Sequence, residues 1–481
     1  MGSLDRRART GANAIGRWLV AHPRLSALAA GPLAALGFSP YNLWPLALAA
    51  LALFVALVAH APNGKSAAWR GWMFGFGHFT LGNSWIAVAF GYQANMPAWL
   101  GSIAVLLLAV YLAVFPALAA LAGWWLAGRA RTGWVMVPAL AGGWIVAEWL
   151  RSWAFTGYAW NPLAMIALGP FERPGLAAIA QFTGTYALSG MVIALGGCWW
   201  LAARWRERRG LAIALALLPV LALLVPRPLG EPREGTLRYT LVQPDIRQEK
   251  LNEREYFEEN FARTAALSRP RDDEPRLVLW PESGIQDFLR EGYPFRYYLR
   301  FNYLADPLAS KRRIARTIGV NALLLSGTQD LEFEDGALAG ARNSVTAIDG
   351  SGQIRASYNK AHLVPYGEYL PMRDVLEPLG LSRLVPGAVD FFPGPGPRTL
   401  ELGEYGRAGV QVCYEIVFSG QVVDRSDRPD YIFNPSNDGW FGPSGPPQHL
   451  AQARMRAIEE GLPVLRSTTT GISAVIDARG V

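Results

Sequence analysis

The first half of the chain consists of long apolar stretches separated by short polar loops. An α-helix needs about 20 mostly apolar residues to cross a bilayer. We identify seven candidate stretches, near residues 25–38, 44–59, 71–90, 98–126, 134–150, 176–201 and 211–226. The first two are short and closely spaced, so one long hairpin is an alternative for them. The pattern predicts a polytopic α-helical membrane domain over residues 1–226.

The pattern changes after residues 227–236, a segment rich in proline, glycine and charge that we interpret as a linker. Beyond it, short runs rich in β-branched residues alternate with polar, helix-like segments. Strands are expected near 237–243, 277–282, 322–328, 344–348, 354–359, 408–414, 431–434 and 464–477, and helices near 253–267, 307–318 and 447–460. Strands that alternate with helices are typical of layered α/β domains. We therefore expect residues 237–481 to form one α/β domain.

The composition separates the same two halves. Residues 1–226 contain 15 Lys and Arg, 4 Asp and Glu and 16 of the 18 Trp, whereas residues 227–481 contain 30 Lys and Arg and 34 Asp and Glu. The basic excess therefore belongs to an apolar, Trp-rich half, as in a membrane domain with aromatic belts and basic loops. Because the second half carries no basic-patch signature, we expect no nucleic-acid partner.

The basic residues also predict an orientation. Counted over alternate loops of the first half, they number 13 on one side and 2 on the other. Cytoplasmic loops carry the excess of Lys and Arg, so the N-terminus is expected in the cytoplasm. Seven crossings would then place the second half on the outer side of the membrane.

Three polar residues that end predicted strands could perform chemistry: Glu282, Lys360 and Cys413. Taken singly, each has an ordinary explanation, namely a strand-end turn, a solvated lysine and a small buried cysteine. Together they suit acyl transfer, because a cysteine reacts as its thiolate and a carboxylate can accept the thiol proton. An ammonium can then stabilise the tetrahedral oxyanion.

Other candidates are weaker. The chain has 2 Cys and 5 His. Cys198 lies in an apolar stretch and is expected to be packing, while His362 follows Lys360 closely and His449 begins a predicted helix. Neither histidine suits the role of base as well as Glu282. No P-loop and no metal-ligand spacing occurs in the sequence, so we expect neither a cofactor nor a metal.

The motifs around the three strand ends are specific. They are Trp280-Pro281-Glu282-Ser283, Asn359-Lys360, Pro365-Tyr366-Gly367-Glu368 and Cys413-Tyr414-Glu415. Further motifs are Gln243–Gln248, Gly327-Thr328, Ser436–Gly442 with Trp440, Gln448-His449, Ala453–Ala457 and, in the first half, Arg151-Ser152-Trp153 with Phe155-Thr156-Gly157. The set resembles the Glu–Lys–Cys signature of the nitrilase superfamily. Joined to a membrane domain, it resembles the apolipoprotein N-acyltransferase family of bacterial inner membranes.

The resemblance implies a nitrilase-like αββα sandwich for residues 237–481. It implies that Cys413 is the nucleophile and forms a thioester, that Glu282 is the general base, and that Lys360 stabilises the oxyanion. Glu368 and Glu415 would orient Lys360 and the pocket. Tyr414 and Trp440 would belong to the pocket lining.

The resemblance also implies a function. The family transfers a fatty acyl chain from a phospholipid to the α-amino group of the N-terminal diacylglyceryl-cysteine of lipoproteins. The expected partners are therefore a phospholipid donor, lipoprotein acceptors and membrane lipids, and the expected location is the bacterial inner membrane with the catalytic domain on the periplasmic side.

The sequence departs from the family in two places. The family usually has a tryptophan shortly after the Gln-x-x-Ile-x-Gln run, where this chain has Leu251, so that residue's role is not carried over. The family also continues beyond the Thr470–Ser473 stretch to a further strand and a final membrane helix, which we expect to be missing from a sequence that stops at Val481.

Two segments suggest a lid at the membrane interface. Residues 288–304 combine aromatic side chains with arginines, and residues 376–397 are rich in Leu, Pro and Gly and contain Phe391 and Phe392. Aromatic rings and cations suit the headgroup region of a bilayer. The alternative is an ordinary buried helix followed by a proline-rich loop.

Two other functions compete with acyl transfer. One is a membrane-tethered amidase or nitrilase that uses the same three residues and passes the acyl group to water. The other is a lipid-binding or chaperone protein without catalysis. The apolar segments at 288–304 and 376–397 argue against the first, and three polar residues at the ends of apolar strands argue against the second.

Overall fold

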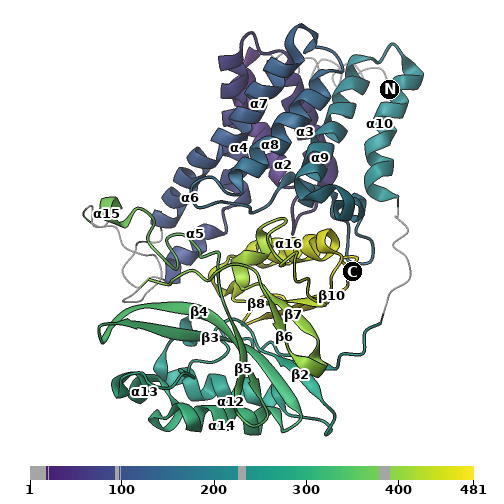
Figure 1. Cartoon of the computed structure of the whole chain (residues 1–481). Coiled ribbons are helices and arrows are strands. Elements are labelled where there is room, and N and C mark those ends of the chain that lie inside the picture. The colour runs from purple at the N-terminus through teal and green to yellow at the C-terminus, as the bar shows by residue number, and fades with distance from the viewer. Residues whose placement is uncertain are drawn as a thin grey trace, which may run out of the picture. The chain divides into compact units, whose positions relative to one another are not determined.

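The computed structural model describes residues 18–19, 21–92, 97, 99–225, 234–376, 378 and 390–481. The chain separates into two compact units, the first formed by residues up to 87 and by 99–227, the second by 88–98 and 228–481. Most of the expected linker lies outside the described residues. The two units are described separately below (Figure 1).

Unit 1 is helical, and a helix lies at each of the seven apolar stretches. The helices are α2 (Pro23–Ala35), α3 (Trp44–Ala59), α4 (Gly64–Gly82), α6 (Trp99–Leu112) followed directly by α7 (Val114–Ala127), α8 (Met136–Arg151), α9 (Ala180–Arg204) and α10 (Arg209–Leu224). The two closely spaced stretches near the start are two separate helices, α2 and α3. Of the described helices, the stretches Trp99–Ala130 and Leu176–Arg204 are long and apolar enough to cross a membrane, while α3 and α10 are apolar but shorter.

Glycines allow the helices of unit 1 to pack closely. A Cβ atom on Gly31 of α2 would lie 2.2 Å from the carbonyl oxygen of Phe74 in α4, and one on Gly77 of α4 would lie 2.4 Å from that of Leu28. Small residues at such crossings let two helix backbones approach each other, which is the usual packing mode of helices in lipid.

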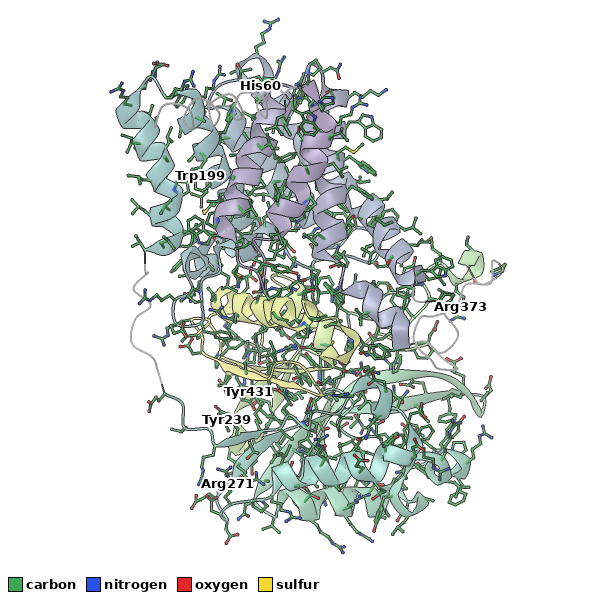
Figure 2. All side chains as sticks on the ribbon, turned by 180° about the vertical axis from the view of Figure 1, so that it is seen from behind. His60, Trp199, Tyr239, Arg271, Arg373 and Tyr431 are labelled. Atoms are coloured by element: carbon green, nitrogen blue, oxygen red, sulfur yellow. The ribbon has the colours of Figure 1, made fainter. Side chains whose placement is uncertain are left out.

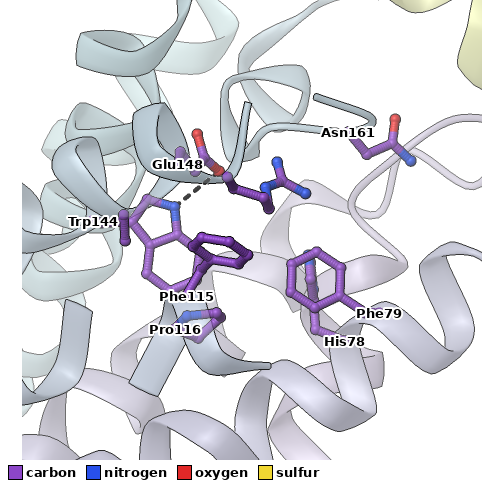
Figure 3. Close-up of a pocket in the computed structure, with 9 residues that line it drawn as sticks. His78, Phe79, Phe115, Pro116, Trp144, Glu148 and Asn161 are labelled. Atoms are coloured by element: carbon purple, nitrogen blue, oxygen red, sulfur yellow. Dashed lines mark hydrogen bonds between the residues drawn. The ribbon is translucent and has the colours of Figure 1, made fainter. Parts of the chain in front are cut away.

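Unit 1 also buries a polar cluster, formed by Glu148 and Arg151 of α8 with Asn161 (Figure 3). Glu148 Oε1 accepts hydrogen bonds from Trp144 Nε1 at 2.9 Å and from the backbone N–H of Leu163 at 2.8 Å. Arg151 donates to the carbonyl oxygen of Trp160 at 3.0 Å. These side chains therefore hold the loop that follows α8.

Unit 2 contains two five-stranded sheets. The first has the order β1-β2-β3-β4-β5, and the second the order β10-β9-β8-β7-β6. The strands of the first sheet are β1 (Tyr239–Leu241), β2 (Arg276–Leu279), β3 (Ala322–Glu334), β4 (Ala337–Asp349) and β5 (Ile354–Asn359). Those of the second are β6 (Thr399–Glu401), β7 (Arg407–Val410), β8 (Tyr431–Ser436), β9 (Val464–Thr468) and β10 (Ala474–Ile476).

The two sheets pack face to face. One core cluster joins Leu277, Leu323 and Val345 of the first sheet to Val410 and Phe433 of the second. Tyr431 of β8 belongs to this core, whereas Tyr239 at the start of β1 is 41% exposed (Figure 2).

Helices cover the outer faces of the sheets. The helices α12 (Phe257–Ser268) and α14 (Pro307–Ile318) lie on the first sheet, where Ile314, Ile318 and Phe261 pack on a second core cluster, and α16 (Gly445–Glu460) lies on the other side (Figure 1). The remaining short helices are α11 (Gln248–Leu251), α13 (Phe295–Phe301) and α15 (Arg373–Leu376). This is the αββα layering expected from the resemblance.

Several element boundaries differ from the expectations. The run 464–477 forms two strands, because a turn with Gly471 at φ +117° separates β9 from β10. The strands β3 and β4 form a longer hairpin than expected, closed by Asp335 and Gly336, both at positive φ. The short edge strand β6 was not expected. The turn at Asp349–Gly352 joins β4 to β5.

Candidate active site

The candidate nucleophile sits on a strained turn. Cys413 follows β7 and opens a short 3₁₀ helix, Cys413–Val417, with φ +50°. A non-glycine residue rarely adopts this left-handed conformation, and such strain is concentrated at functional sites. The cysteine is 7% exposed. The strand and turn therefore hold the thiol in one fixed position inside unit 2.

Glu282 and Lys360 reach the same place from the first sheet. Lys360 follows β5 and is 1% exposed, and its Nζ lies 3.6 Å from Oε1 of Glu282, which follows β2. Both charges influence the pKa of the Cys413 thiol, which belongs to the core between the two sheets. The structure thus places Glu282 and Lys360 in contact at the ends of two strands of the first sheet, and Cys413 after a strand of the second sheet, within reach of their charges.

The turn that carries Glu282 depends on a glycine. Gly327 of β3 lies so close that a Cβ atom there would be 2.6 Å from the backbone nitrogen of Ser283 and 2.7 Å from Cα of Glu282. Ser283 itself has φ +55°. Any side chain at position 327 would therefore displace the turn that carries Glu282.

The thiol and the ammonium have clear protonation preferences. Burial raises the pKa of the Cys413 thiol well above its ordinary value, Glu282 raises it further, and Lys360 opposes them. Burial alone would lower the pKa of Lys360, but Glu368 and then Glu282 raise it above its ordinary value. The resting site therefore holds a neutral thiol beside a charged ammonium, and the thiol needs a base in order to react.

Asn343 joins the two carboxylates at Lys360. Its Nδ2 donates to Glu282 Oε1 and to Glu368 Oε1, each at 2.8 Å. Lys360 Nζ lies 2.9 Å from Glu368 Oε2, which also accepts from the backbone N–H of Val364. Asn343 immediately precedes the strand expected at 344–348, and no role was predicted for it from the sequence. The one indication in the sequence is its polar side chain at the start of that strand.

Glu415 ties the turn after Lys360 to the turn of Cys413. It is 2% exposed, and its Oε1 accepts from the Tyr358 hydroxyl at 2.8 Å and from the backbone N–H groups of Ala361 and His362 at 2.7 and 3.2 Å. Its Oε2 accepts from the backbone N–H of Val412 at 2.7 Å. Burial is the largest influence on its pKa, which is raised to about 7 against the effect of these donors. Glu415 thus acts as a positioning residue.

A second buried hydrogen-bond network contacts the backbone of Cys413. The carbonyl oxygen of Cys413 accepts a hydrogen bond from His449 Nε2 at 3.1 Å, and His449 Nδ1 lies 2.8 Å from Asp438 Oδ1. Arg466 donates to both oxygens of Asp438 at 2.8 and 2.9 Å. Sequence analysis gave none of these three residues a role, although Asp438 and His449 lie in matching motifs. Through the bond to its carbonyl oxygen, this network helps to hold the backbone of Cys413 in place.

Tyr414 and Trp440, the two residues expected in the pocket lining, differ in their exposure and in their aromatic partners. Tyr414 is 9% exposed and packs edge-to-face on Phe418 with 5.1 Å between ring centroids. Trp440 is half-buried and packs edge-to-face on Tyr92, at 5.9 Å. Leu251, where the family usually has tryptophan nearby, is 2% exposed at the end of α11.

The two segments expected to form a lid contribute to one aromatic cluster. Phe288 and Tyr298 are buried in it, and Phe391 packs against it. The Phe391 N–H donates to the carbonyl oxygen of Glu368, and the Phe392 N–H donates to that of Ala341 in β4. Residues 377 and 379–389 of the second segment lie outside the described residues. The part that is described is therefore attached to the sheet edge and to the turn that carries Glu368.

The sandwich and the buried cysteine define an enzyme fold of the carbon–nitrogen hydrolase class, and a family model described as carbon-nitrogen hydrolase matches residues 240–481. A model described as the apolipoprotein N-acyltransferase N-terminal domain matches residues 30–198. The chain belongs to the apolipoprotein N-acyltransferase family.

Relatives of that name cover nearly the whole chain. The protein from Allorhizobium ampelinum is 34% identical over 95% of this chain and 86% of its own length. Those from Sinorhizobium fredii and Bradyrhizobium diazoefficiens are each 36% identical, over 94% and 95% of this chain and 85% of their own lengths. The match therefore includes both units.

Solved structures similar to this chain include Nit3 of Saccharomyces cerevisiae, a member of branch 10 of the nitrilase superfamily. It is 18% identical, covers 51% of this chain and 83% of its own, and has a TM-score of 0.34. A carbon-nitrogen hydrolase from Helicobacter pylori is 16% identical, with coverages of 51% and 82% and a TM-score of 0.32.

Proposed function

We propose that this chain is a phospholipid-dependent N-acyltransferase. It transfers a fatty acyl chain from a phospholipid to the α-amino group of the N-terminal diacylglyceryl-cysteine of lipoproteins, through a thioester on Cys413. The observation that carries the proposal is the meeting of Cys413, Glu282 and Lys360 at buried strand ends, in a chain whose relatives are named apolipoprotein N-acyltransferase.

In the first step, Glu282 accepts the thiol proton as the sulfur attacks the ester carbonyl carbon of the phospholipid. Concerted transfer is needed because the pKa of Cys413 is raised and the free thiolate is disfavoured. Lys360, held as an ammonium by Glu368 and Glu282, donates to the oxyanion of the tetrahedral intermediate. The carbon–oxygen bond then breaks, Glu282 returns the proton to the departing lysophospholipid oxygen, and the thioester remains.

In the second step, the α-amino group of the lipoprotein attacks the thioester carbon and gives a proton to Glu282. The carbon–sulfur bond breaks, the amide is released, and the sulfur recovers the proton. A thioester reacts with an amine more readily than the starting ester does, so one difficult aminolysis becomes two easier reactions. The sequence of steps is ping-pong, because the first product leaves before the second substrate reacts.

We also propose that residues 1–226 form a multi-pass membrane domain of the bacterial inner membrane, with residues 237–481 as a catalytic domain on the periplasmic side. Support comes from the helix at each apolar stretch and from the 13-to-2 asymmetry of basic residues between alternate loops. A reporter that is active only outside the cytoplasm should be active when fused after Gly235 and inactive when fused after Arg209. The opposite pattern would reverse the orientation.

The catalytic proposal is tested by intact-protein mass spectrometry after incubation with phospholipid. The purified protein should gain the mass of one fatty acyl group. Cys413→Ala should not, whereas Cys198→Ala, which removes the other cysteine, should behave like the parent. Addition of a diacylglyceryl lipopeptide should discharge the acyl-enzyme and give the N-acyl product.

Two results would contradict the proposal. A mass gain that survives in Cys413→Ala would place the acyl group elsewhere. Release of free fatty acid at the same rate with and without lipopeptide would instead identify an amidase-like hydrolase that transfers the acyl group to water.

A further inference from the structure

A basic pocket lies on the outer side of the first sheet, between α12, α14 and the turn Tyr303–Ala305. Its volume is about 610 Å³, which is within the range of small-molecule sites. Arg269, which follows α12, and Arg312, Arg313 and Arg316 of α14 line it. None of the residues that line this pocket belongs to the candidate active site.

One of the four arginines is held in place by its neighbours. Arg313 donates to both carboxylate oxygens of Glu258 at 2.6 and 2.7 Å. Its guanidinium also lies 3.7 Å from the ring centroid of Phe261 and 4.4 Å from that of Tyr303. Arg313 is therefore a fixed part of the pocket wall, and Glu258 neutralises its charge.

The positive charges of the other three arginines are not neutralised by a bonded acidic side chain of the described residues. Among the described residues, no side chain forms a hydrogen bond or an ion pair with the guanidinium groups of Arg269, Arg312 or Arg316. Arg312 and Arg316 are four residues apart on α14, so both point from the same face of the helix. Three like charges around one concavity repel each other, and an anion placed between them would relieve that repulsion.

The rim of the pocket is apolar. Leu304 is 74% exposed and lines the pocket, together with Ala265, Pro270 and Ala309. Leu304 is presented by a turn in which it and Ala305 both have φ +53°. Asp287 fixes this turn, because its Oδ1 accepts from the Tyr303 N–H at 2.8 Å. The pocket is thus lined both by arginine side chains and by apolar side chains, of which Leu304 is held by the turn.

We propose that this pocket binds the phosphate group of an anionic ligand. The planar guanidinium fork matches the oxygens of a phosphate group better than a point charge does, and several arginines in one concavity allow bidentate contacts from more than one side. The phosphate could belong to a lipid headgroup, for which the apolar rim would contact the glycerol and upper acyl chains, or to a small soluble phosphate ester.

The test uses the full-length protein in detergent at fixed ionic strength, because salt screens exposed charges. Binding is measured for inorganic phosphate, for sn-glycerol 3-phosphate and for a short-chain diether phosphatidylglycerol, which cannot donate an acyl group from an ester. The pocket variant is Arg312→Gln with Arg316→Gln. The matched control is Arg355→Gln with Arg425→Gln, which removes the same charge from exposed positions outside the pocket and outside the aromatic segments 288–304 and 376–397.

The pocket variant should weaken binding of at least one of the three ligands by about tenfold or more, since each arginine contributes a charge-assisted hydrogen bond. The control variant should change binding by less than about twofold. Arginine-dependent binding of the soluble phosphates would identify a small phosphate ester, and arginine-dependent binding of the diether lipid alone would identify a headgroup.

Equal loss in the pocket and control variants would overturn the proposal, because it would show only a general effect of net charge. Absence of arginine-dependent binding for all three ligands would overturn it too. Thioester formation on Cys413 from a water-soluble activated ester, measured in the same preparations, should be unchanged in both variants. That readout shows that the variants are folded and separates this proposal from the one on acyl transfer.

Discussion

Charged side chains are buried in both units of this chain, and their hydrogen bonds are satisfied to different degrees. In unit 2, Lys360 Nζ lies between Glu282 and Glu368, and Asn343 donates to both carboxylates. In unit 1, Glu148 Oε2, Arg151 Nε and Asn161 Nδ2 are buried and have no hydrogen-bond partner among the residues that the structure describes, around a cavity of about 10 Å³ (Figure 3). A cavity of that size has room for about one water molecule.

The partners of the two clusters explain the difference. Glu148 and Arg151 of unit 1 bond the N–H of Leu163 and the carbonyl oxygen of Trp160 in the loop after α8, so they fix that loop. The charges of unit 2 bind one another and act on a thiol. Burial of a charge is thus a poor marker of chemistry by itself. A better marker of a catalytic site is a reactive atom whose pKa is influenced by buried charged groups that are themselves fully hydrogen-bonded.

The largest expected effect tests whether the unit 2 cluster is chemical. Glu282→Gln keeps the shape of the side chain but removes the base, so acylation of Cys413 should slow by about 10²–10⁴. The midpoint of thermal unfolding should stay close to that of the parent. The rate is measured by mass spectrometry with a phospholipid donor. Glu404→Gln, at an exposed position, is the matched control, and a near-normal rate in Glu282→Gln would remove it from the role of base.

The second effect separates positioning from chemistry within unit 2. Glu415 is protonated more readily in the folded chain than in the unfolded one, because its pKa is raised to about 7 from 4.5. Its stabilisation is therefore present below about pH 4.5 and is lost as the pH rises through about 7, a change on the order of 3 kcal/mol.

Glu415→Gln should flatten that part of the pH profile, because glutamine does not titrate. It should also slow acylation by roughly tenfold, since a glutamine cannot accept from the turn after Lys360 and from the Val412 N–H with both of its terminal atoms. Thermal unfolding between pH 4 and pH 8, with the parent measured in parallel, gives the first result. An unchanged difference in stability at the two ends of this range would contradict the assigned cause.

The third effect tests whether the unit 1 cluster is structural. Arg151→Gln removes the hydrogen bond to the carbonyl oxygen of Trp160, and the free energy of unfolding of the purified protein should fall by about 1–3 kcal/mol. Thioester formation with a water-soluble activated ester should change by less than about threefold. A loss of that reaction comparable to the loss in Glu282→Gln would show that the two clusters do not differ in the way we describe.

The positions of Glu282 and Cys413 after strands could be predicted because each closes an apolar run. The strand order, the facing of the two sheets and the contacts of Asn343 could not. They depend on which strands become neighbours, and parallel neighbours such as β2 and β3 or β8 and β9 pair across long connections whose course no local pattern specifies. The backbone strain at Cys413 was also hidden, since no glycine marks the positive φ.

Unit 1 shows the reverse situation. Apolar length predicted a helix at each of the seven stretches, because a helix satisfies its own backbone hydrogen bonds and needs no distant partner. The buried Glu148 was overlooked because the residues it bonds, among them Leu163 in the loop after α8, are brought to it only by the fold. The loop motif at Arg151-Ser152-Trp153 was visible in the sequence, but its function as an anchor became clear only from the hydrogen bond to Trp160.

The smallest expected effect concerns the aromatic cluster beside the active site. Phe391 packs on Phe288 and its neighbours, the ring of Phe392 lies against Gly340, and the backbone of Phe391 is bonded to Glu368, which holds Lys360. If these rings guide lipid chains toward Cys413, Phe391→Ser with Phe392→Ser should slow acylation from a bilayer phospholipid several-fold more than acylation from a short, water-soluble activated ester.

The measurement is the ratio of the two acylation rates, variant against parent, because a ratio cancels any loss of active protein. Tyr239→Ser is the control, since Tyr239 is 41% exposed and lies in β1, outside both aromatic segments. The size of the effect should be modest, because the backbone bonds to Glu368 and Ala341 remain in the variant and keep the turn in place. An equal loss with both donors would mean that the rings act only by packing, through the turn that carries Glu368. The lid function proposed for the two segments would then be wrong, while the assignment of Cys413, Glu282 and Lys360 would stand.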